Sequence, residues 1–269
     1  MKRKPARYLL ALGLIVLPVL IALLGPVVAG PAGARAVSFA SGDGHWLGTD
    51  FSGRDVWHQV LLGGRPVVIV AVAATALTYL VAVPLGLTAA LTHRTWLEET
   101  LMRPLDVVIA VPSLLLVLLV AATLTPGPVG LTVLVAAVAV PDAARVVHAA
   151  AVEVSSRPAV EALRMQGESW WRTTIGYVAR SLRRTLAADA GIRLTGALYL
   201  VATAAFLGVG VPPDAADWAV MVDRNRTGLF LQPWAVVVPA LLIAALSMGT
   251  NLLFDAALQR PTPRKGATR

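Results

Sequence analysis

The sequence predicts an all-α integral membrane protein with six transmembrane helices. Of its 269 residues, 57% are hydrophobic and 14% are charged, which is more apolar surface than one globular core of this length buries. Six apolar stretches reach the roughly 20 helical residues that a hydrocarbon core about 30 Å thick requires. Lys and Arg also concentrate in alternate connecting segments, as the positive-inside rule leads one to expect of a multi-pass protein.

The expected spans follow one another along the whole chain. They are Tyr8–Ala29, Val67–Leu91, Leu105–Leu124, Val129–Val147, Gly191–Val209 and Trp234–Phe254. The first span follows Lys2-Arg3-Lys4 and precedes Ala34-Arg35-Ala36, a pattern that imitates a cleavable signal peptide. Its apolar run of about 22 residues exceeds the roughly 7–15 of a signal-peptide core, so we expect an uncleaved anchor. Pro84 and Pro112 are expected to kink their spans.

These spans divide the chain into four regions. Residues 1–29 form an N-terminal tail and anchor helix, and residues 30–66 form an external loop. Residues 67–258 form a five-helix core that includes a basic segment at about 149–185, and residues 259–269 form a tail. With the N-terminus in the cytoplasm, 18 of the 23 Lys and Arg residues lie inside. Both termini and the basic segment are therefore predicted to be cytoplasmic in a cell-membrane protein.

Several mechanisms find no support in the residues. The charges of the expected spans (Asp106, Asp142, Arg145 and Arg193) lie near their cytoplasmic ends, so no coupling-ion relay is predicted at mid-membrane. None of the three lysines follows a glycine, which excludes a nucleotide-binding P-loop. The chain has no cysteine, which excludes disulfides and thiolate metal sites. Energy for uphill transport would have to come from another chain.

Other candidate sites are weak. Gly167-Glu168-Ser169-Trp170-Trp171 lacks the final glycine of a nucleophile elbow, and no nucleophile–base pair supports a membrane hydrolase. Gly208-Val209-Gly210 lacks the third glycine of a dinucleotide loop. Four external-loop residues could in principle meet a divalent cation, although scattered loop polars are usually solvated; they are His45, Asp50, Asp55 and His58. The net charge of +8 is distributed by loop, unlike that of a nucleic-acid-binding surface.

The basic segment contains a short helix signal. Pro158 suits a first helical turn because its missing N–H has no intrahelical partner there, and Glu161 favours the positive end of the helix dipole. Ala162 permits close approach, and Gly167 permits a sharp turn before Trp170 and Trp171. From its charge alone, a solvated basic loop is the favoured interpretation of this segment.

Two external segments carry turn signals. We expect Ser52 or Asp50 to cap a short helix from about Arg54 to Leu62, with glycines setting the preceding turn. A structural role for this segment is favoured over contact with a substrate. The Val211-Pro212-Pro213 stretch must leave helical geometry. Trp218 is suited to the outer membrane interface or to packing beneath a docked protein. This second segment is interpreted as a gate or docking element.

Together, three ordered segments resemble the permease subunit of ABC importers for dipeptides, oligopeptides or nickel. They are Leu47-Gly48-Thr49-Asp50-Phe51-Ser52-Gly53-Arg54-Asp55-Val56, the Glu161-Ala162 to Gly167 segment, and Ala205-Phe206-Leu207-Gly208-Val209-Gly210-Val211-Pro212-Pro213 before Asp217-Trp218. The resemblance implies a type I importer fold, in which two related membrane subunits form a pathway, two cytoplasmic ATPases drive it and an external binding protein delivers cargo. It implies a transport subunit rather than an enzyme, with no cofactor on this chain and ATP and magnesium on the ATPases.

The resemblance also assigns roles to residues. It implies a coupling helix over roughly 159–167 that docks on the ATPase, with Glu161, Ala162 and Gly167 at matching positions and Pro158 and Arg164 beside them. Its external motif comprises Gly48, Thr49, Asp50, Gly53, Arg54 and Asp55, and its gate loop comprises Gly208, Gly210, Pro212 and Trp218. Departures from the pattern bear on how the coupling segment ends and which ATPase it accepts; these are Leu163 for a second alanine, Tyr177 for histidine, and Ala179-Arg180 for Leu-Pro.

Two questions stay open at this point. Peptide is the first choice of cargo, with nickel or another small solute as the alternative, and the sister subunit is expected to be a different chain although a homodimer is compatible with the sequence. A membrane scaffold that recruits a cytoplasmic partner through the same basic segment, without transport, is the alternative from another class.

Overall fold

The computed structural model describes residues 3–42, 44–92 and 94–258, and the side chains of residues 3–8, 164 and 255–258 lie outside that description. Within these ranges the chain is helical, and its only β structure is two isolated bridges. Four helices are long and apolar enough to cross a membrane: Leu9–Val28, Val56–Leu91, Pro128–Ser155 and Trp234–Phe254. The predicted all-α membrane fold is therefore confirmed. The tail predicted for residues 259–269 lies outside the described residues.

The number of crossings differs from the simple count of apolar runs. A fifth crossing forms if α3 (Thr95–Ile109) and α4 (Ser113–Leu124), which meet at a bend of 85°, are taken as one span. The sixth predicted span falls in α7 (Arg180–Phe206), whose 27 residues give about 40 Å of helix. Asp189 and Arg193 make α7 less apolar than the other long helices. Six crossings therefore stay a prediction.

The third expected span, Leu105–Leu124, is wrong as a single straight helix. The chain leaves helical geometry at Pro112, whose φ of −55° and ψ of 126° place it immediately before α4. Proline has no N–H to continue the hydrogen-bond ladder of α3, and it disfavours helical geometry in the residue before it. The predicted kink at Pro112 is therefore a break between two helices. By contrast, α2 (Val56–Leu91) continues through Pro84.

Helix α2 is longer than the sequence predicted. One 36-residue helix replaces the expected short helix near Arg54–Leu62 and the separate span from Val67. Its cap is Asp55, whose carboxylate accepts a hydrogen bond from the backbone N–H of His58 at 2.8 Å. The prediction of Ser52 or Asp50 as the cap is wrong, because the Asp50 carboxylate instead binds the turn that precedes the helix.

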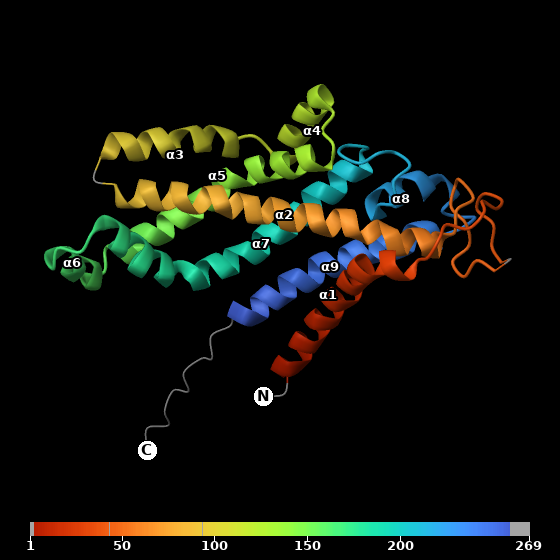
Figure 1. Cartoon of the computed structure of the whole chain (residues 1–269), viewed down its shortest axis with the longest axis horizontal. Helices are drawn as coiled ribbons and strands as arrows, with labels where there is room; N and C mark the ends of the chain where they lie inside the picture. Colours follow the sequence, from red (N-terminus) through yellow and green to blue (C-terminus); the bar gives the residue numbers. More distant parts are fainter. Residues whose placement is uncertain (1–2, 43, 93, 259–269) are drawn as a thin grey trace, which may run out of the picture.

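The packing centres on α2, which contacts α5 (Pro128–Ser155) and α7 through a shared apolar core. Small residues such as Ala71 and Ala74 of α2 face Val135 of α5 and Val201 of α7 in that core. Helices α1 (Arg3–Val28) and α9 (Trp234–Leu258) pack against each other beside it. Figure 1 shows α6 (Pro158–Met165) at one end of the long axis and α8 (Trp218–Asn225) at the other. The two candidate functional regions therefore lie at opposite ends of the molecule.

Candidate coupling segment and external loops

The segment between α5 and α7 forms a helical elbow, comprising residues 156–179. Its first element, α6, begins at Pro158 as predicted. Val160 of α6 is fully buried, and it joins an apolar cluster with Leu91 of α2, Val154 of α5 and Leu182 of α7. Val160 thus packs α6 into a cluster to which α2, α5 and α7 also contribute.

The opposite face of α6 is open to solvent. Pro158, Glu161, Ala162 and Met165 are all exposed, and Met165 exposes 83% of its surface. Their spacing of three and four residues places them on one side of the helix. The predicted coupling residues Glu161 and Ala162 are therefore brought together on a surface that a partner can reach. The side chain of Arg164 lies outside the described residues.

Gly167 ends α6 with a left-handed turn. Its φ is +76°, a conformation that glycine adopts without the Cβ clash of other residues. Across this turn, the backbone N–H of Glu168 donates to the carbonyl of Leu163 at 3.1 Å. The backbone N–H of Gln166 donates to the carbonyl of Ala162 at 3.0 Å. These bonds close the end of the helix in the manner of a Schellman motif. The sharp turn predicted at Gly167 is confirmed.

After the turn, two tryptophans return the chain to the long helices. The rings of Trp170 and Trp171 meet edge to face with their centroids 4.8 Å apart. The indole N–H of Trp170 donates to the carbonyl of Leu91, the last residue of α2, at 3.4 Å. Val178, in the π-helical turn η1 (Arg172–Ala179), joins the same apolar cluster as Val160. The elbow is therefore packed onto the ends of α2, α5 and α7 rather than extended into solvent.

The departures from the family pattern lie in this elbow. Leu163 and Tyr177 line a cavity of about 260 Å³ together with Glu168, Arg172 and Thr173. The chain passes from η1 into α7 at Ala179 and Arg180 without leaving helical geometry, and the Arg180 N–H donates to the carbonyl of Tyr177. A proline at position 180 has no N–H for this bond. Continuous helix here follows from the absence of that proline.

The external motif uses its polar side chains to build its own turn. The Asp50 carboxylate accepts hydrogen bonds from the backbone N–H groups of Ser52 and Arg54, both at 2.8 Å, and from the Ser52 hydroxyl at 2.9 Å. The Thr49 hydroxyl accepts from the Ala40 N–H and donates to the Val37 carbonyl. Gly48 and Gly53 have φ of +70° and +76°. These contacts support the structural interpretation of the motif.

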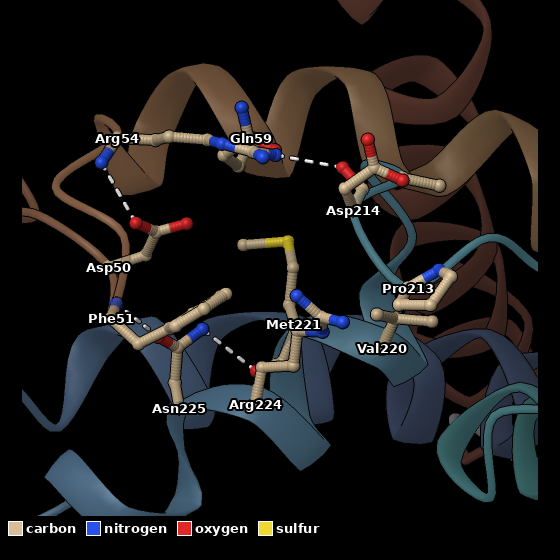
Figure 2. Close-up of a pocket in the computed structure, with 11 residues that line it drawn as sticks. Asp50, Phe51, Arg54, Gln59, Pro213, Asp214, Val220, Met221, Arg224 and Asn225 are labelled. Carbon is tan, nitrogen blue, oxygen red and sulfur yellow. Dashed lines mark hydrogen bonds between the residues drawn. The ribbon is translucent and has the colours of Figure 1, made fainter. Parts of the chain in front are cut away.

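A second set of contacts ties the same turn to α8 and to the loop that precedes it, as Figure 2 shows. The Arg54 guanidinium donates to the Asp214 carbonyl at 2.8 Å, and the Phe51 N–H donates to the Asn225 side chain at 2.9 Å. The Arg224 guanidinium lies 5.1 Å from the centre of the Phe51 ring, a cation–π distance. The cavity between these residues is only about 10 Å³, which is room for about one water molecule.

The four candidate metal ligands of the external loop do not converge. Asp55 caps α2 and its carboxylate lies 2.6 Å from Nδ1 of His45. Asp50 binds the neighbouring turn, and the His58 ring lies 3.3 Å from the Gly30 carbonyl. Among the described residues, no three His, Asp or Glu side chains are placed to hold a metal ion.

The predicted gate loop has two parts with different environments. Gly208 and Gly210 have φ of +78° and +81°, and with Pro212 they line a cavity of about 300 Å³ beside the turn that follows α4. Trp218 is fully buried, so its expected place at the outer membrane interface is wrong, while its packing beneath a docked protein stays a prediction. Its ring fits over Gly64, and its indole N–H donates to the Val60 carbonyl at 2.8 Å. Two adjacent glycines of α2, Gly63 and Gly64, make room for the ring.

Asp217 precedes Trp218 and caps α8. One carboxylate oxygen accepts from the N–H groups of Ala219 and Val220 at 2.9 and 3.3 Å. The other oxygen is buried and has no hydrogen-bond partner among the described residues. Burial raises the pKa of Asp217 to about 6, although the two backbone hydrogen bonds oppose this shift. At neutral pH the cap therefore carries a buried charge that the two backbone N–H groups compensate only in part.

Two charges of the expected spans lie far from the ends of their helices. Asp142 lies near the midpoint of α5, and Arg193 near that of α7, whereas both were expected near the cytoplasmic ends of their spans. The helices differ from the expected spans because α5 extends eight residues beyond Val147, to Ser155, and α7 begins at Arg180 instead of Gly191. The depth of the two charges in the membrane stays a prediction. Their ion pairing was missed, and its sequence signal was the three- and four-residue spacing of charges inside apolar runs.

Comparisons with known proteins agree with this arrangement. Residues 82–263 match the family described as the binding-protein-dependent transport system inner membrane component. A probable D,D-dipeptide transport system permease protein of Escherichia coli K12 is 28% identical over 82% of this chain and 74% of its own length. A glutathione transport system permease protein of Pectobacterium atrosepticum is 27% identical over 82% and 73%. A protein named for a peptide transport system permease in Brucella suis is 29% identical over 98% and 89%.

Solved structures extend the likeness to the fold. A chain of an inward-facing methionine ABC transporter superposes with a TM-score of 0.57, covering 72% of this chain and 94% of that one at 15% identity. A second crystal form of the same transporter gives a TM-score of 0.54 at 14% identity. At this level of identity the superposition supports the fold alone.

Proposed function

The chain belongs to the family of binding-protein-dependent transport system inner membrane components, and on that premise we propose that it forms, with a sister permease subunit, the translocation pathway of an ATP-driven peptide importer. Hydrolysis of ATP takes place on two separate cytoplasmic ATPase subunits, and an external binding protein delivers the cargo. The chain itself acts as a transport subunit rather than an enzyme.

One observation carries the coupling role of the elbow. The exposed face of α6, with Pro158, Glu161, Ala162 and Met165, is backed by Val160 in a cluster shared with α2, α5 and α7. A load applied to the exposed face therefore passes to α5 and η1, which α6 contacts, and through the shared cluster to α2 and α7. Interfaces packed in this way respond by shifting helices as units. The arrangement supports a coupling helix that converts ATPase closure into helix movement.

The orientation and the cargo are part of the same proposal. The concentration of Lys and Arg around the elbow, and the opposite placement of α6 and α8 (Figure 1), favour a cytoplasmic elbow and an external α8. Peptide is the proposed cargo because similar proteins are named for dipeptide, glutathione and peptide transport. Uptake of labelled dipeptide that an excess of unlabelled peptide suppresses, and that nickel leaves unchanged, would support peptide over nickel.

A bulky substitution on the exposed face tests the docking role. We expect Ala162→Trp to abolish co-purification of the ATPase subunits and peptide uptake, because the ring fills the surface that the ATPase contacts. Ala187→Trp, at an exposed alanine of α7, is the matched control and should preserve both. Full co-purification and uptake with Ala162→Trp would contradict the proposal.

A further inference from the structure

A ladder of alternating charges crosses four helices in the membrane-spanning part of the molecule. Asp106 of α3 pairs with Arg145 of α5. Asp142, three residues before Arg145, lies 3.5 Å from the Arg193 guanidinium of α7. Arg193 also contacts Asp189 at 3.3 Å, and Asp189 accepts a hydrogen bond from the Tyr79 hydroxyl of α2 at 2.5 Å.

The middle of this ladder lies within the hydrocarbon layer. Helix α5 has 28 residues, so it is about 42 Å long and exceeds a hydrocarbon core of roughly 30 Å by about 12 Å. Asp142 lies about 20 Å from either end of α5 at about 1.5 Å per residue. Wherever the excess length falls, Asp142 stays inside the core, provided that α5 crosses the bilayer.

The members of the ladder differ in exposure. The side chains of Asp189 and Arg193 are largely buried and are paired on their own helix, four residues apart. The side chains of Asp142, Asp106 and Arg145 are 52%, 51% and 40% exposed. The charges on α5 and α3 are thus more exposed than those on α7. The three-residue spacing places Asp142 and Arg145 on one side of α5, and Asp106 pairs with Arg145 there.

Exposed charges at this depth restrict what covers that surface. An ionised side chain that faces lipid tails near the bilayer centre costs about 3 kcal/mol or more. Asp106 and Arg145 pair with each other, whereas Asp142 has a single long contact, to Arg193, among the described residues. The remaining oxygen lone pairs of Asp142 therefore require water or another polar surface. Lipid is therefore a poor neighbour for this face.

We propose that the surface formed by Asp106, Asp142 and Arg145 lines the aqueous translocation pathway, and that Asp142 is in contact with pathway water in the assembled transporter. This inference rests on the proposed transport function. It is favoured over permanent burial against the sister subunit because Arg193 keeps Asp189 as a partner when Asp142 separates from it. The ladder can therefore hydrate on one side without leaving a buried charge unpaired.

Thiol chemistry tests this placement, since the chain has no cysteine of its own. The full transporter, with its sister subunit and ATPases, is expressed with Asp142→Cys and treated in membranes with a membrane-impermeant methanethiosulfonate reagent, with and without ATP and vanadate. Leu80→Cys is the matched control, because Leu80 of α2 is 71% exposed and apolar. Only the thiolate reacts, and it forms in water, so we expect modification at position 142 to be at least about tenfold faster than at position 80 in one or both states.

A second variant guards against misfolding. Val138→Cys changes a partly exposed residue one turn from Asp142 and leaves the ladder charges intact, and it should also react faster than Leu80→Cys. Reaction at neither position in the assembled transporter, in any nucleotide state, would overturn the proposal. Reaction only in the isolated subunit would also overturn it and would place the face against the sister chain. Because labelling is read without uptake or ATPase docking, its failure is distinguishable from failure of the proposed function.

Discussion

Gly167 is the residue on which the shape of the elbow depends most directly. Its φ of +76° is unfavourable for any residue with a Cβ, yet an added Cβ would meet no atom within 4 Å. The cost of substitution therefore comes from the backbone alone. An alanine at this position therefore tests conformational strain alone. A larger residue would add steric blocking at the surface proposed to meet the ATPase.

We expect Gly167→Ala to destabilise the elbow by about 1 kcal/mol, because alanine in the left-handed region carries a Cβ clash of that size. Hydrogen exchange should then be about fivefold faster at the Glu168 N–H that closes the turn. Gly176→Ala is the control, since Gly176 lies in η1 and its added Cβ would make only an ordinary contact at 3.8 Å with Arg172. Equal exchange rates in the two variants would contradict the assigned strain.

Asp217 makes the stability of the end that carries α8 depend on pH. Its pKa is raised from 3.8 to about 6 by burial, so the folded state binds a proton more tightly than the unfolded state does. The contribution of the protonated Asp217 to the free energy of unfolding is complete below about pH 4. It is lost as the pH rises through about 6. The shift corresponds to a free energy on the order of 3 kcal/mol.

Asp217→Asn should remove this dependence, because asparagine retains a cap oxygen and carries no charge. The measurement is the melting temperature of the purified transporter between pH 4 and pH 7. The melting temperature of the wild type should fall over this range, and Asp217→Asn should lack the part of the fall that comes from Asp217. Asp214→Asn, at an exposed carboxylate nearby, should preserve the wild-type profile. An unchanged profile in Asp217→Asn would show that another group titrates.

Among the elements, α6 is held by very little. Its inward contact is dominated by Val160, while the surface proposed to meet the ATPase lies on the opposite side. Docking and force transmission are thus carried by different residues of one short helix. The two steps can be separated by changing the inward face only.

Val160→Ala should uncouple transport from hydrolysis. Removing two methyl groups from a fully buried site costs about 2 kcal/mol, so α6 would move without carrying α2, α5 and α7 with it. The ATPases should co-purify in full, while the ratio of peptide imported to ATP hydrolysed falls. Val152→Ala, at an exposed valine of α5, should leave that ratio unchanged. Loss of co-purification with Val160→Ala would instead assign the inward face a role in docking.

Local signals predicted the elements better than they predicted their joints. Apolar runs placed the long helices, and Pro158 and Gly167 marked both ends of α6, because helix starts and left-handed turns are decided by residues close in sequence. The merging of the external helix with α2 was missed, and so was the packing of Trp218 over Gly63 and Gly64 of the merged helix, from about 150 residues away. The burial of Trp218 and the pairing of Asp142 with Arg193 likewise require contacts between distant segments.

For the whole molecule, the decisive arrangement is the separation of two surfaces. The elbow and the external loops lie at opposite ends of the helical bundle (Figure 1). Between them, α2, α5 and α7 run through two apolar clusters, one beside the elbow and one in the middle of the bundle. A change in the packing of the elbow can therefore reach the gate loop through rigid helices, as alternating access requires.

This separation predicts opposite accessibility of two engineered thiols. Met165→Cys in the elbow and Trp46→Cys in the external loop replace residues that are 83% and 89% exposed, and neither competes with a native cysteine. In intact cells, a membrane-impermeant maleimide should label position 46 only. When inside-out vesicles are permeabilised, both positions should be labelled. In sealed inside-out vesicles, position 165 alone should react, because the positive-inside rule places the basic elbow in the cytoplasm. Labelling of position 165 in intact cells would reverse the orientation and leave the elbow without access to cytoplasmic ATPases.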